Sequence, residues 1–234
     1  MAKILLIETA TEVCSTAIAI DGKVVAMAEE LQAQQHASLL TLQIETCVRE
    51  SGIPLAAIDA VAVSSGPGSY TSLRVGASVA KGICYALGKP LIAVDTLLAL
   101  TDAAQDRQAA TVFIPMLDAR RQEVWAAAYD ASQREIAPAQ PLILENNLFE
   151  KFIAGLPEQF RKGPLVVAGN GSHKLESAGA DENTVFSAVK NCSSGHFSAL
   201  AERFFQNADF QDVAYFEPFY MKPPHITTPT RAVL

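Results

Sequence analysis

The sequence predicts an α/β fold of two lobes, each expected to be a β-β-β-α-β-α unit. Two successive series of apolar segments along the 234 residues have this order, with strand-length runs first and helical patterns between later strands. Each series has an acidic residue after its first strand, at Glu8 and at Asp118. Each also has a loop with two nearby glycines after a later strand, at Gly66 and Gly68 and at Gly169 and Gly171.

The first half of the chain has the order β-β-β-α-β-α-β. Apolar runs predict strands at residues 4–7, 14–20 and 24–28, and Asp21-Gly22 provides the positive φ values of a tight hairpin turn between the last two. We then expect, in order, a helix over 36–50 that stops at Gly52, a strand over 60–63, a helix over 72–87, a strand over 91–94 and a short helix around 96–104.

The second half follows a similar order, although no sequence repeat relates the two halves. Its predicted strands cover residues 112–117, 124–129, 142–144, 165–168 and 185–186, and its predicted helices cover 148–154, 173–177 and 197–205. This duplicated order describes the actin/Hsp70-like (ASKHA) architecture, with lobes expected at 1–105 and 106–234. Residues 131–164 are weakly patterned, and the proline-rich tail over 215–229 is predicted to be extended.

Composition and charge restrict the classes of partner. The formal net charge of -7, from 18 basic and 25 acidic residues, disfavours direct binding to a nucleic-acid backbone. The longest basic run is Arg120-Arg121, so any nucleic-acid role is expected to be indirect. We expect neither export nor membrane contact, since no signal-type leader and no membrane-spanning run are present. The four cysteines form no C-x-x-C pair, which predicts buried thiols in a reducing cytoplasm.

Residues 64–87 form the least ordinary stretch, which is predicted to be a strand, a tight loop and a helix. The Gly66-Pro67-Gly68 run suits a sharp turn, but the Gly-Lys-Ser/Thr ending of a phosphate-binding P-loop is absent. The helix has one narrow polar stripe and is otherwise apolar or small. It is therefore either an interior helix of a larger fold or a helix that completes its burial against a partner protein. The helix over 36–50 is also broadly apolar.

No residue is assigned to catalysis or to a metal ion. Glu8 and Asp118 with the glycine loops indicate at most a vestigial nucleotide site, because the first hairpin lacks a glycine and carries a second acid at Glu12. None of the four histidines has another histidine four residues away, and no G-x-S-x-G is present. An actin-like ATPase or kinase is the alternative function, ahead of a glycoprotease-like metallopeptidase.

Three motifs resemble those of the bacterial TsaB (YeaZ) family. Residues 65–76 and the Ala80-Lys81-Gly82 triplet are similar to its G-P-G-S-F-T-G-L-R-I-G and A-K-G signatures, with Tyr70 for Phe and Ser72 for Gly. Residues 7–11 resemble its first hairpin, where Glu8 replaces the more usual Asp. Residues 118–125 resemble D-A-R-R-x-E-V-Y, with Trp125 for Tyr. Length and element order agree over essentially the whole chain.

This resemblance implies a non-catalytic, dimerising subunit in the formation of N6-threonylcarbamoyladenosine in tRNA. The related subunit TsaD carries an H-x-x-x-H metal motif after a P-L-x-x-V-N strand, and the two histidine positions fall here on Thr96 and Leu100. The implied partners are TsaD, the ATPase TsaE through the TsaB–TsaD pair, and a second copy when TsaD is absent, with tRNA contacted only indirectly. No cofactor is implied, with ATP or ADP at the complex interface as a weaker alternative.

The resemblance places the partner interface on the two first-lobe helices. Its implied residues are His36, Leu39, Leu40, Ile44, Cys47, Arg74, Gly76, Ala77, Val79, Ala80, Ile83 and Leu87. The signature loop is formed by Gly66, Pro67, Gly68, Ser69 and Tyr70. The vestigial nucleotide site would consist of Glu8, Asp118, Gly169 and Gly171.

Overall fold

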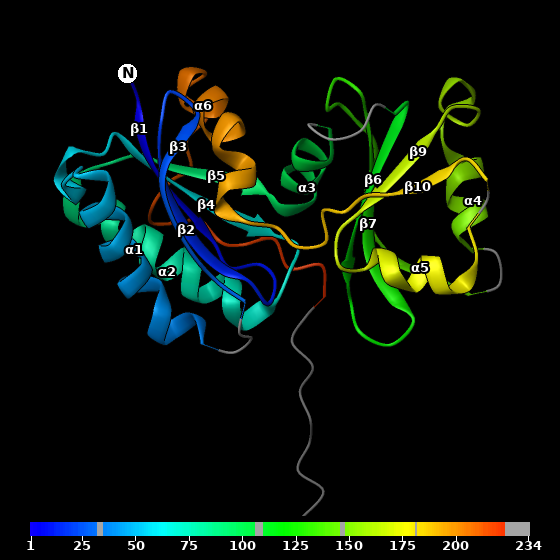
Figure 1. The fold of residues 1–234 in the computed structure, drawn as a ribbon, viewed down its shortest axis with the longest axis horizontal. Coiled ribbons are helices and arrows are strands. Elements are labelled where there is room, and N and C mark those ends of the chain that lie inside the picture. The colour runs from blue at the N-terminus through cyan, green and yellow to red at the C-terminus, as the bar shows by residue number, and fades with distance from the viewer. Residues whose placement is uncertain (32–34, 106–109, 146–147, 181, 223–234) are drawn as a thin grey trace, which may run out of the picture.

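The computed structural model has two lobes, each built on a five-stranded mixed sheet (Figure 1). It describes residues 1–31, 35–105, 110–145, 148–180 and 182–222. The part of the predicted extended tail beyond Lys222 lies outside the described residues. In the described part of the chain, no helix combines the length and the apolar character needed to cross a membrane.

The first sheet has the strand order β3-β2-β1-β4-β5. Its antiparallel meander consists of β1 (Lys3–Glu8), β2 (Cys14–Ile20) and β3 (Lys23–Glu30), and β4 (Ala60–Gly66) and β5 (Leu91–Asp95) continue from β1 as parallel strands. Asp21 and Gly22 have the predicted positive φ values, 49° and 74°. The order β-β-β-α-β-α-β of the first half is confirmed.

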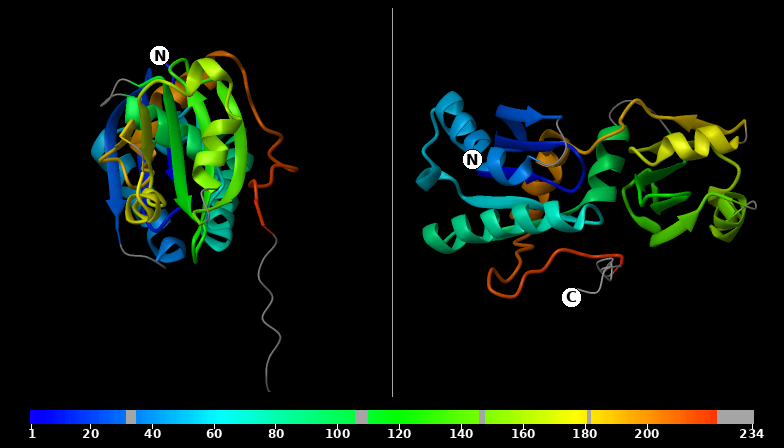
Figure 2. Two further views of the ribbon diagram at one scale, coloured as in Figure 1. Left: turned by 90° about the vertical axis from the view of Figure 1, so that its right-hand side faces the viewer. Right: turned by 90° about the horizontal axis from the view of Figure 1, so that it is seen from below.

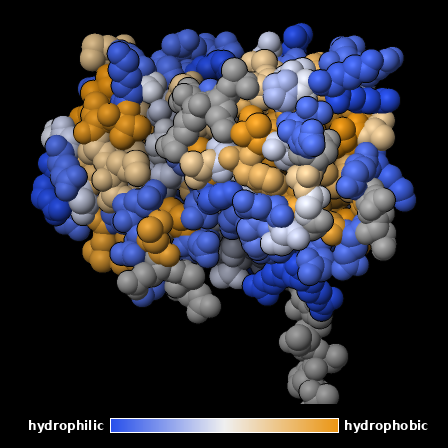
Figure 3. Space-filling model, turned by 45° about the vertical axis from the view of Figure 1, so that its right-hand side comes forward, coloured by the Kyte–Doolittle hydropathy of each residue, from blue (hydrophilic) through white to orange (hydrophobic). Residues whose placement is uncertain are grey.

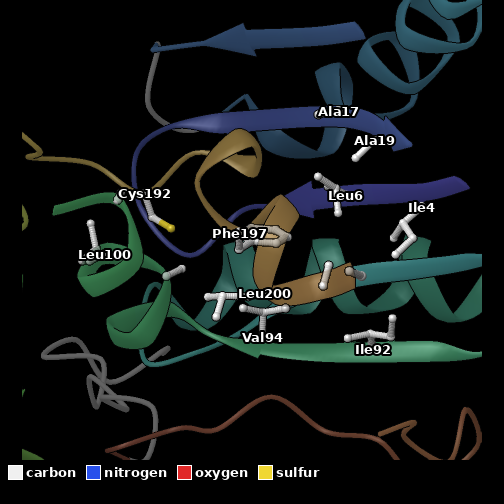
Figure 4. Close-up of a cluster of buried hydrophobic side chains, with 14 of the residues drawn as sticks. Ile4, Leu6, Ala17, Ala19, Ile92, Val94, Leu100, Cys192, Phe197 and Leu200 are labelled. Atoms are coloured by element: carbon white, nitrogen blue, oxygen red, sulfur yellow. The ribbon is translucent and has the colours of Figure 1, made fainter. Parts of the chain in front are cut away.

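Helices cover both faces of the first sheet. The helices α1 (His36–Ser51) and α2 (Tyr70–Leu87) cover one face, where they pack on alternate strand residues such as Leu5 and Ile7. The other face is covered by α3 (Thr96–Gln105), the 3₁₀ turn η3 (Ser194–Phe197) and α6 (Ser198–Gln206). Figure 4 shows Phe197 and Leu200 facing Leu6 and Val94 in this second core. The alternation of apolar side chains therefore fills two cores from one sheet.

The second sheet has the order β10-β9-β6-β7-β8. Its strands are β6 (Val112–Asp118), β7 (Glu123–Asp130), β8 (Glu135–Ile143), β9 (Leu165–Ala168) and β10 (Thr184–Phe186). The helices α4 (Leu148–Gly155) and α5 (Ser172–Ala178) lie on its outer side, and α3 lies between the two lobes (Figure 1). The predicted two-lobed α/β class is confirmed.

Two of the strands were predicted to be markedly shorter than they are. The strand β4 continues past residue 63 to Gly66, because Ser64 and Gly66 still pair with β5 across a bulge. The strand β8 begins seven residues before the predicted 142–144, despite Pro138 and Pro141. A sheet edge tolerates proline because one side of the strand needs no ladder hydrogen bonds, and β8 is an edge strand.

The predicted division of the chain at residue 105 differs from the structure in its last part. After β10 the chain returns to the first lobe, where η3 and α6 contact β1, β3 and β5. Gln211 forms an isolated bridge with Leu91 at the edge of β5, and Phe216 is buried in the core beneath α2. Phe197 and Leu200 cover apolar residues on the face of the first sheet opposite α1 and α2. Residues 193–219 therefore belong with the first lobe.

The four thiols are buried as predicted, at Cys14, Cys47, Cys84 and Cys192. Burial raises the pKa of each thiol, because the apolar surroundings disfavour the thiolate. These cysteines act as small hydrophobic side chains of the core.

Two glycines of α2 allow a matched test of this packing. An added Cβ at Gly76 would lie 2.3 Å from the Thr9 hydroxyl oxygen, whereas one at Gly82 would meet no atom within 4 Å. We expect Gly76→Ala to lower the free energy of unfolding by about 1–3 kcal/mol through overpacking. Gly82→Ala should raise it by about 0.5–1 kcal/mol through helix propensity. Urea denaturation checks both, and equal effects of the two substitutions would contradict this arrangement.

Candidate functional site

The signature loop lies between the turn that follows β1 and the C-terminal tail. The Ser69 amide donates a hydrogen bond of 2.7 Å to the Ala10 carbonyl oxygen, and the Phe219 amide donates one of 2.7 Å to the Ser65 carbonyl oxygen. Ser69 is the N-cap of α2, and its hydroxyl accepts a hydrogen bond from the Ser72 amide. The loop therefore connects two segments that are distant from it in sequence, the turn after β1 and the tail.

The two loop glycines allow close backbone contacts inside the protein. An added Cβ at Gly68 would lie 2.3 Å from the Ala10 carbonyl oxygen. Gly66 has a φ of +102°, and an added Cβ there would lie 2.5 Å from the Phe219 carbonyl oxygen. Both positions need glycine for contact with neighbouring backbone, so packing accounts for them without a phosphate.

A cleft of about 1110 Å³ lies between the lobes beside this loop. The first lobe contributes Tyr70, whose ring centroid is 4.6 Å from that of Tyr220 in the tail. The Arg74 guanidinium carbon lies 4.3 Å from the Tyr70 centroid. The second lobe contributes Arg120 and Trp125 to the opposite wall.

Glu8, the first residue of the expected nucleotide site, is fully buried on the core side of the first sheet. One carboxyl oxygen accepts a hydrogen bond from the Ala10 amide, and the other has no hydrogen-bond partner among the described residues. Burial raises the pKa of this carboxyl to about 7, although the hydrogen bond from the Ala10 amide opposes the rise. Glu8 is thus a buried titratable group, shielded from solvent.

Asp118, Gly169 and Gly171 are occupied by contacts within the second lobe. The Asp118 carboxylate forms an ion pair of 2.6 Å with Lys174. The Gly169 amide donates to the Val189 carbonyl oxygen at 2.8 Å, and the Gly171 amide donates to that of Met116 at 3.0 Å. A phosphate cradle needs free backbone amides, so this glycine loop is not preorganised for one. The structure places Asp118 on the cleft wall and leaves Glu8 in the core.

The two positions where the resemblance places the metal-binding histidines of TsaD lie in α3 (Thr96–Gln105). The side chains of Thr96 and Leu100 are both fully buried. Within the described residues, no group of three or more His, Cys, Asp or Glu side chains could hold a metal ion.

On α1, most of the implied interface residues face the sheet. His36, Leu40, Ile44 and Cys47 are all buried, and Leu40 and Cys47 have no exposed surface. Leu40, Ile44 and Cys47 pack on the first sheet, and the His36 ring contacts the Val13 carbonyl oxygen, so all four are unavailable to a partner in this conformation. Leu39 is half-buried, and Leu42, which was absent from the implied interface, is 56% exposed.

On α2, the small-residue face points inward as well. Gly76, Ala77 and Ala80 are buried, with Ala80 fully covered. We expected these small residues to let a partner helix approach. In the structure they instead allow α2 to pack closely within its own lobe. Arg74 is exposed, and four apolar residues at four-residue intervals stay half-buried, namely Val75, Val79, Ile83 and Leu87.

Sequence reasoning missed the role of the tail. The Lys81 ammonium donates hydrogen bonds to the carbonyl oxygens of Ala214, at 3.1 Å, and Phe216, at 2.9 Å. The tail consequently runs alongside α2 and reaches the signature loop (Figure 2). The aromatic residues between 215 and 220 were a signal for such packing, because fully solvated segments contain few aromatic side chains.

Comparison with known proteins places the chain in a family. A family model described as TsaD, tRNA N6-adenosine threonylcarbamoyltransferase, matches residues 24–232. The chain belongs to this family. The predicted resemblance to its TsaB (YeaZ) branch is confirmed by a curated relative, the tRNA threonylcarbamoyladenosine biosynthesis protein TsaB of Escherichia coli. The two chains are 36% identical over 134 residues, which cover 57% of this chain and 58% of the relative. The match thus spans little more than half of that protein's length.

Solved structures agree with this assignment. YeaZ from Pseudomonas aeruginosa superposes with a TM-score of 0.81 at 25% identity, over 94% of this chain and 100% of that one. An inorganic polyphosphate/ATP-glucomannokinase from Arthrobacter superposes with a TM-score of 0.52 at 14% identity, over 88% and 100%. The second likeness concerns the fold alone, and it confirms the predicted actin-like (ASKHA) architecture of this TsaD-family chain.

The buried carboxyl of Glu8 should make stability depend on pH. Its pKa is about 7 in the folded protein, against 4.5 as the ordinary value, so the folded state holds this proton more tightly than the unfolded state. Stability is therefore lost as pH rises from about 4.5 to about 7. We expect Glu8→Gln to exceed the wild type in free energy of unfolding by on the order of 2 kcal/mol at pH 8.

The difference between Glu8→Gln and the wild type should be smallest well below pH 4.5, where both states of the wild type are protonated. Urea denaturation across this pH range measures it. Glu12→Gln, in the same turn but with an exposed side chain, is the matched control and should follow the wild type. A pH-independent difference would show that Glu8 does not titrate in the folded protein.

Proposed function

We propose that the chain is a non-catalytic subunit that binds and activates TsaD in the formation of N6-threonylcarbamoyladenosine in tRNA. The observation that carries the proposal is the apolar stripe of α2, formed by Val75, Val79, Ile83 and Leu87, which the monomer leaves half-buried. Membership in a family whose model is described as a tRNA N6-adenosine threonylcarbamoyltransferase supports the choice of reaction.

The proposed lack of catalysis rests on α3. Thr96 and Leu100 occupy the positions where the resemblance places the two metal-binding histidines of TsaD, and both are buried. A hydroxyl group and an aliphatic chain cannot replace two imidazole ligands. The chain therefore has to act on the reaction through a protein that holds those ligands.

The proposed interface consists of two adjacent helices. The helix α1 packs beside α2 on the same face of the first sheet and adds the half-buried Leu39 and the exposed Leu42 (Figure 1). Two helices of a partner that pack against this pair would give an interface of roughly 1,200 Å² or more, as stable complexes require. We further propose that a second copy uses this face when TsaD is absent.

Two finer proposals concern the assembled complex. TsaE joins through the pair formed with TsaD, and ATP or ADP binds at the interface of the complex. The amides of Gly169 and Gly171 are engaged within the protein, so the groups that bind the phosphates of this nucleotide would have to come from another chain.

An actin-like ATPase or kinase is the second candidate, and the interlobe cleft in a kinase-like fold favours it. Calorimetry with Mg-ATP on the isolated chain separates the two candidates. Tight binding with turnover would replace the proposed subunit role by an enzyme. Heat signals at the level of the buffer control are expected under the subunit proposal.

The interface proposal predicts loss of TsaD binding when a charge is placed on the α2 stripe. We expect Val79→Glu to lower the affinity for TsaD by at least about tenfold, because an unpaired carboxylate would be desolvated in the interface. The substitution keeps the monomer folded, since Val79 is already half-exposed. Co-elution with TsaD in size-exclusion chromatography measures the effect.

Val185→Glu is the matched control for this substitution. Val185 is 41% exposed on β10 of the second lobe, away from both helices. The control should co-elute with TsaD as the wild type does. Unchanged co-elution of Val79→Glu would exclude the α2 stripe as the interface, and threonylcarbamoyl transfer by the isolated chain would exclude the non-catalytic role.

A further inference from the structure

We propose that the mouth of the interlobe cleft, at the Arg120-Arg121 turn, binds a single-stranded segment of RNA. The inference rests on the proposed function only for the identity of the substrate class, since the matching family model is described as acting on tRNA. It differs from the expectation of purely indirect tRNA contact, which followed from net charge and from the length of the basic runs, without the positions of charged residues around the cleft.

The turn between β6 and β7 presents two guanidinium groups to solvent. Arg120 and Arg121 are both exposed and have positive φ values of 69° and 52°. Two successive residues with a Cβ in the left-handed region are disfavoured, and Asn or Gly is usual at such places. Within the described residues, neither guanidinium has an ion-pair partner. The turn thus holds two unneutralised charges on a disfavoured backbone.

The charges around this turn leave a local excess of positive charge. Asp118 is paired with Lys174 and Glu123 with Lys222, so these two carboxylates are already neutralised. Lys190 also lines the cleft and donates to the Ser172 hydroxyl. Among the charged residues that line the cleft, Glu12 is the acid that no described ion pair neutralises. Figure 3 shows strongly hydrophilic side chains gathered where the described tail ends.

Aromatic side chains stand on both walls of the same cleft. Tyr70 and Tyr220 form a tilted pair at 4.6 Å on one wall, and Trp125 lies on the other. The Trp125 indole nitrogen is buried without a hydrogen-bond partner among the described residues. Aromatic faces beside a cationic groove are what single-stranded RNA uses, because unstacked bases need a ring to stack on and phosphates need cations.

The turn after β1 and the loop over Gly169 and Gly171 argue against a compact polyphosphate as the occupant of the cleft. The amides of Ala10, Gly169 and Gly171 all donate to groups inside the protein. A triphosphate would need such amides free, as in a phosphate cradle. Side-chain cations spaced along a cleft instead suit phosphates that are spread along a chain.

The test uses a fluorescent RNA hairpin with an adenosine-containing loop and measures its anisotropy with the full chain over a range of salt concentrations. Arg120→Asn combined with Arg121→Gly removes both charges and keeps residues that tolerate positive φ. We expect this variant to bind less tightly and to reduce the slope of log K against log salt by about 1.4, as for two lost contacts to single strands. Tyr70→Ala should weaken binding roughly tenfold.

Matched controls distinguish binding at this site from non-specific electrostatic attraction of RNA to any positive charge. Lys151→Gln combined with Lys162→Gln removes two exposed charges from the second lobe outside the cleft and should leave binding unchanged. The Arg120 and Arg121 variant should still co-elute with TsaD, so failure of the subunit proposal and failure of this inference are distinguishable.

Three outcomes would overturn the inference. The first is no binding of the hairpin by the wild-type chain. The second is equal binding by the arginine variant. The third is competition by polyglutamate as effective as by unlabelled RNA, which would assign the turn to an acidic protein.

Discussion

The contact between the signature loop and the turn after β1 fixes the geometry of the first lobe. The Ser69 amide meets the Ala10 carbonyl oxygen at 2.7 Å, and Gly68 leaves no room between the two backbones. This contact sets where α2 begins, and therefore which of its faces is buried. The tail is attached to the same loop through Phe219. The half-buried stripe of α2 and one wall of the cleft thus depend on a few backbone atoms.

The lobes are joined at several places around the cleft. Gln133, in the turn between β7 and β8, donates to Asp102 and Gln105 of α3 and accepts a hydrogen bond from Arg203 of α6. At the mouth of the cleft, Lys222 of the tail pairs with Glu123 of β7. These contacts cross between the lobes, and each of them opposes the relative motion that substrate closure uses in many enzymes.

Sequence patterns predicted the elements well, because most are bounded by local chemistry. Asp21-Gly22 and Gly52 mark a turn and a helix end, and both have the positive φ values that their residue types allow. The direction of the small α2 residues was not predictable, since a helix with apolar residues on most sides has no unique inward face. The local pattern of Gly76 and Ala80 is the same whether a sheet or a partner covers them. The path of the tail depends on tertiary contacts of Lys81 and Phe216, which no local pattern specifies.

The return of the chain after β10 has a consequence for biosynthesis. The second sheet is complete once residue 186 has been made, whereas the first sheet still lacks η3 and α6, which bring Phe197 and Leu200 to the face that α3 covers only in part. Topologically, the second lobe is an insertion in the first. During synthesis from the N-terminus, the lobe that is begun first is therefore finished last, and its inner face is exposed to the ribosome's surroundings until the final helix emerges.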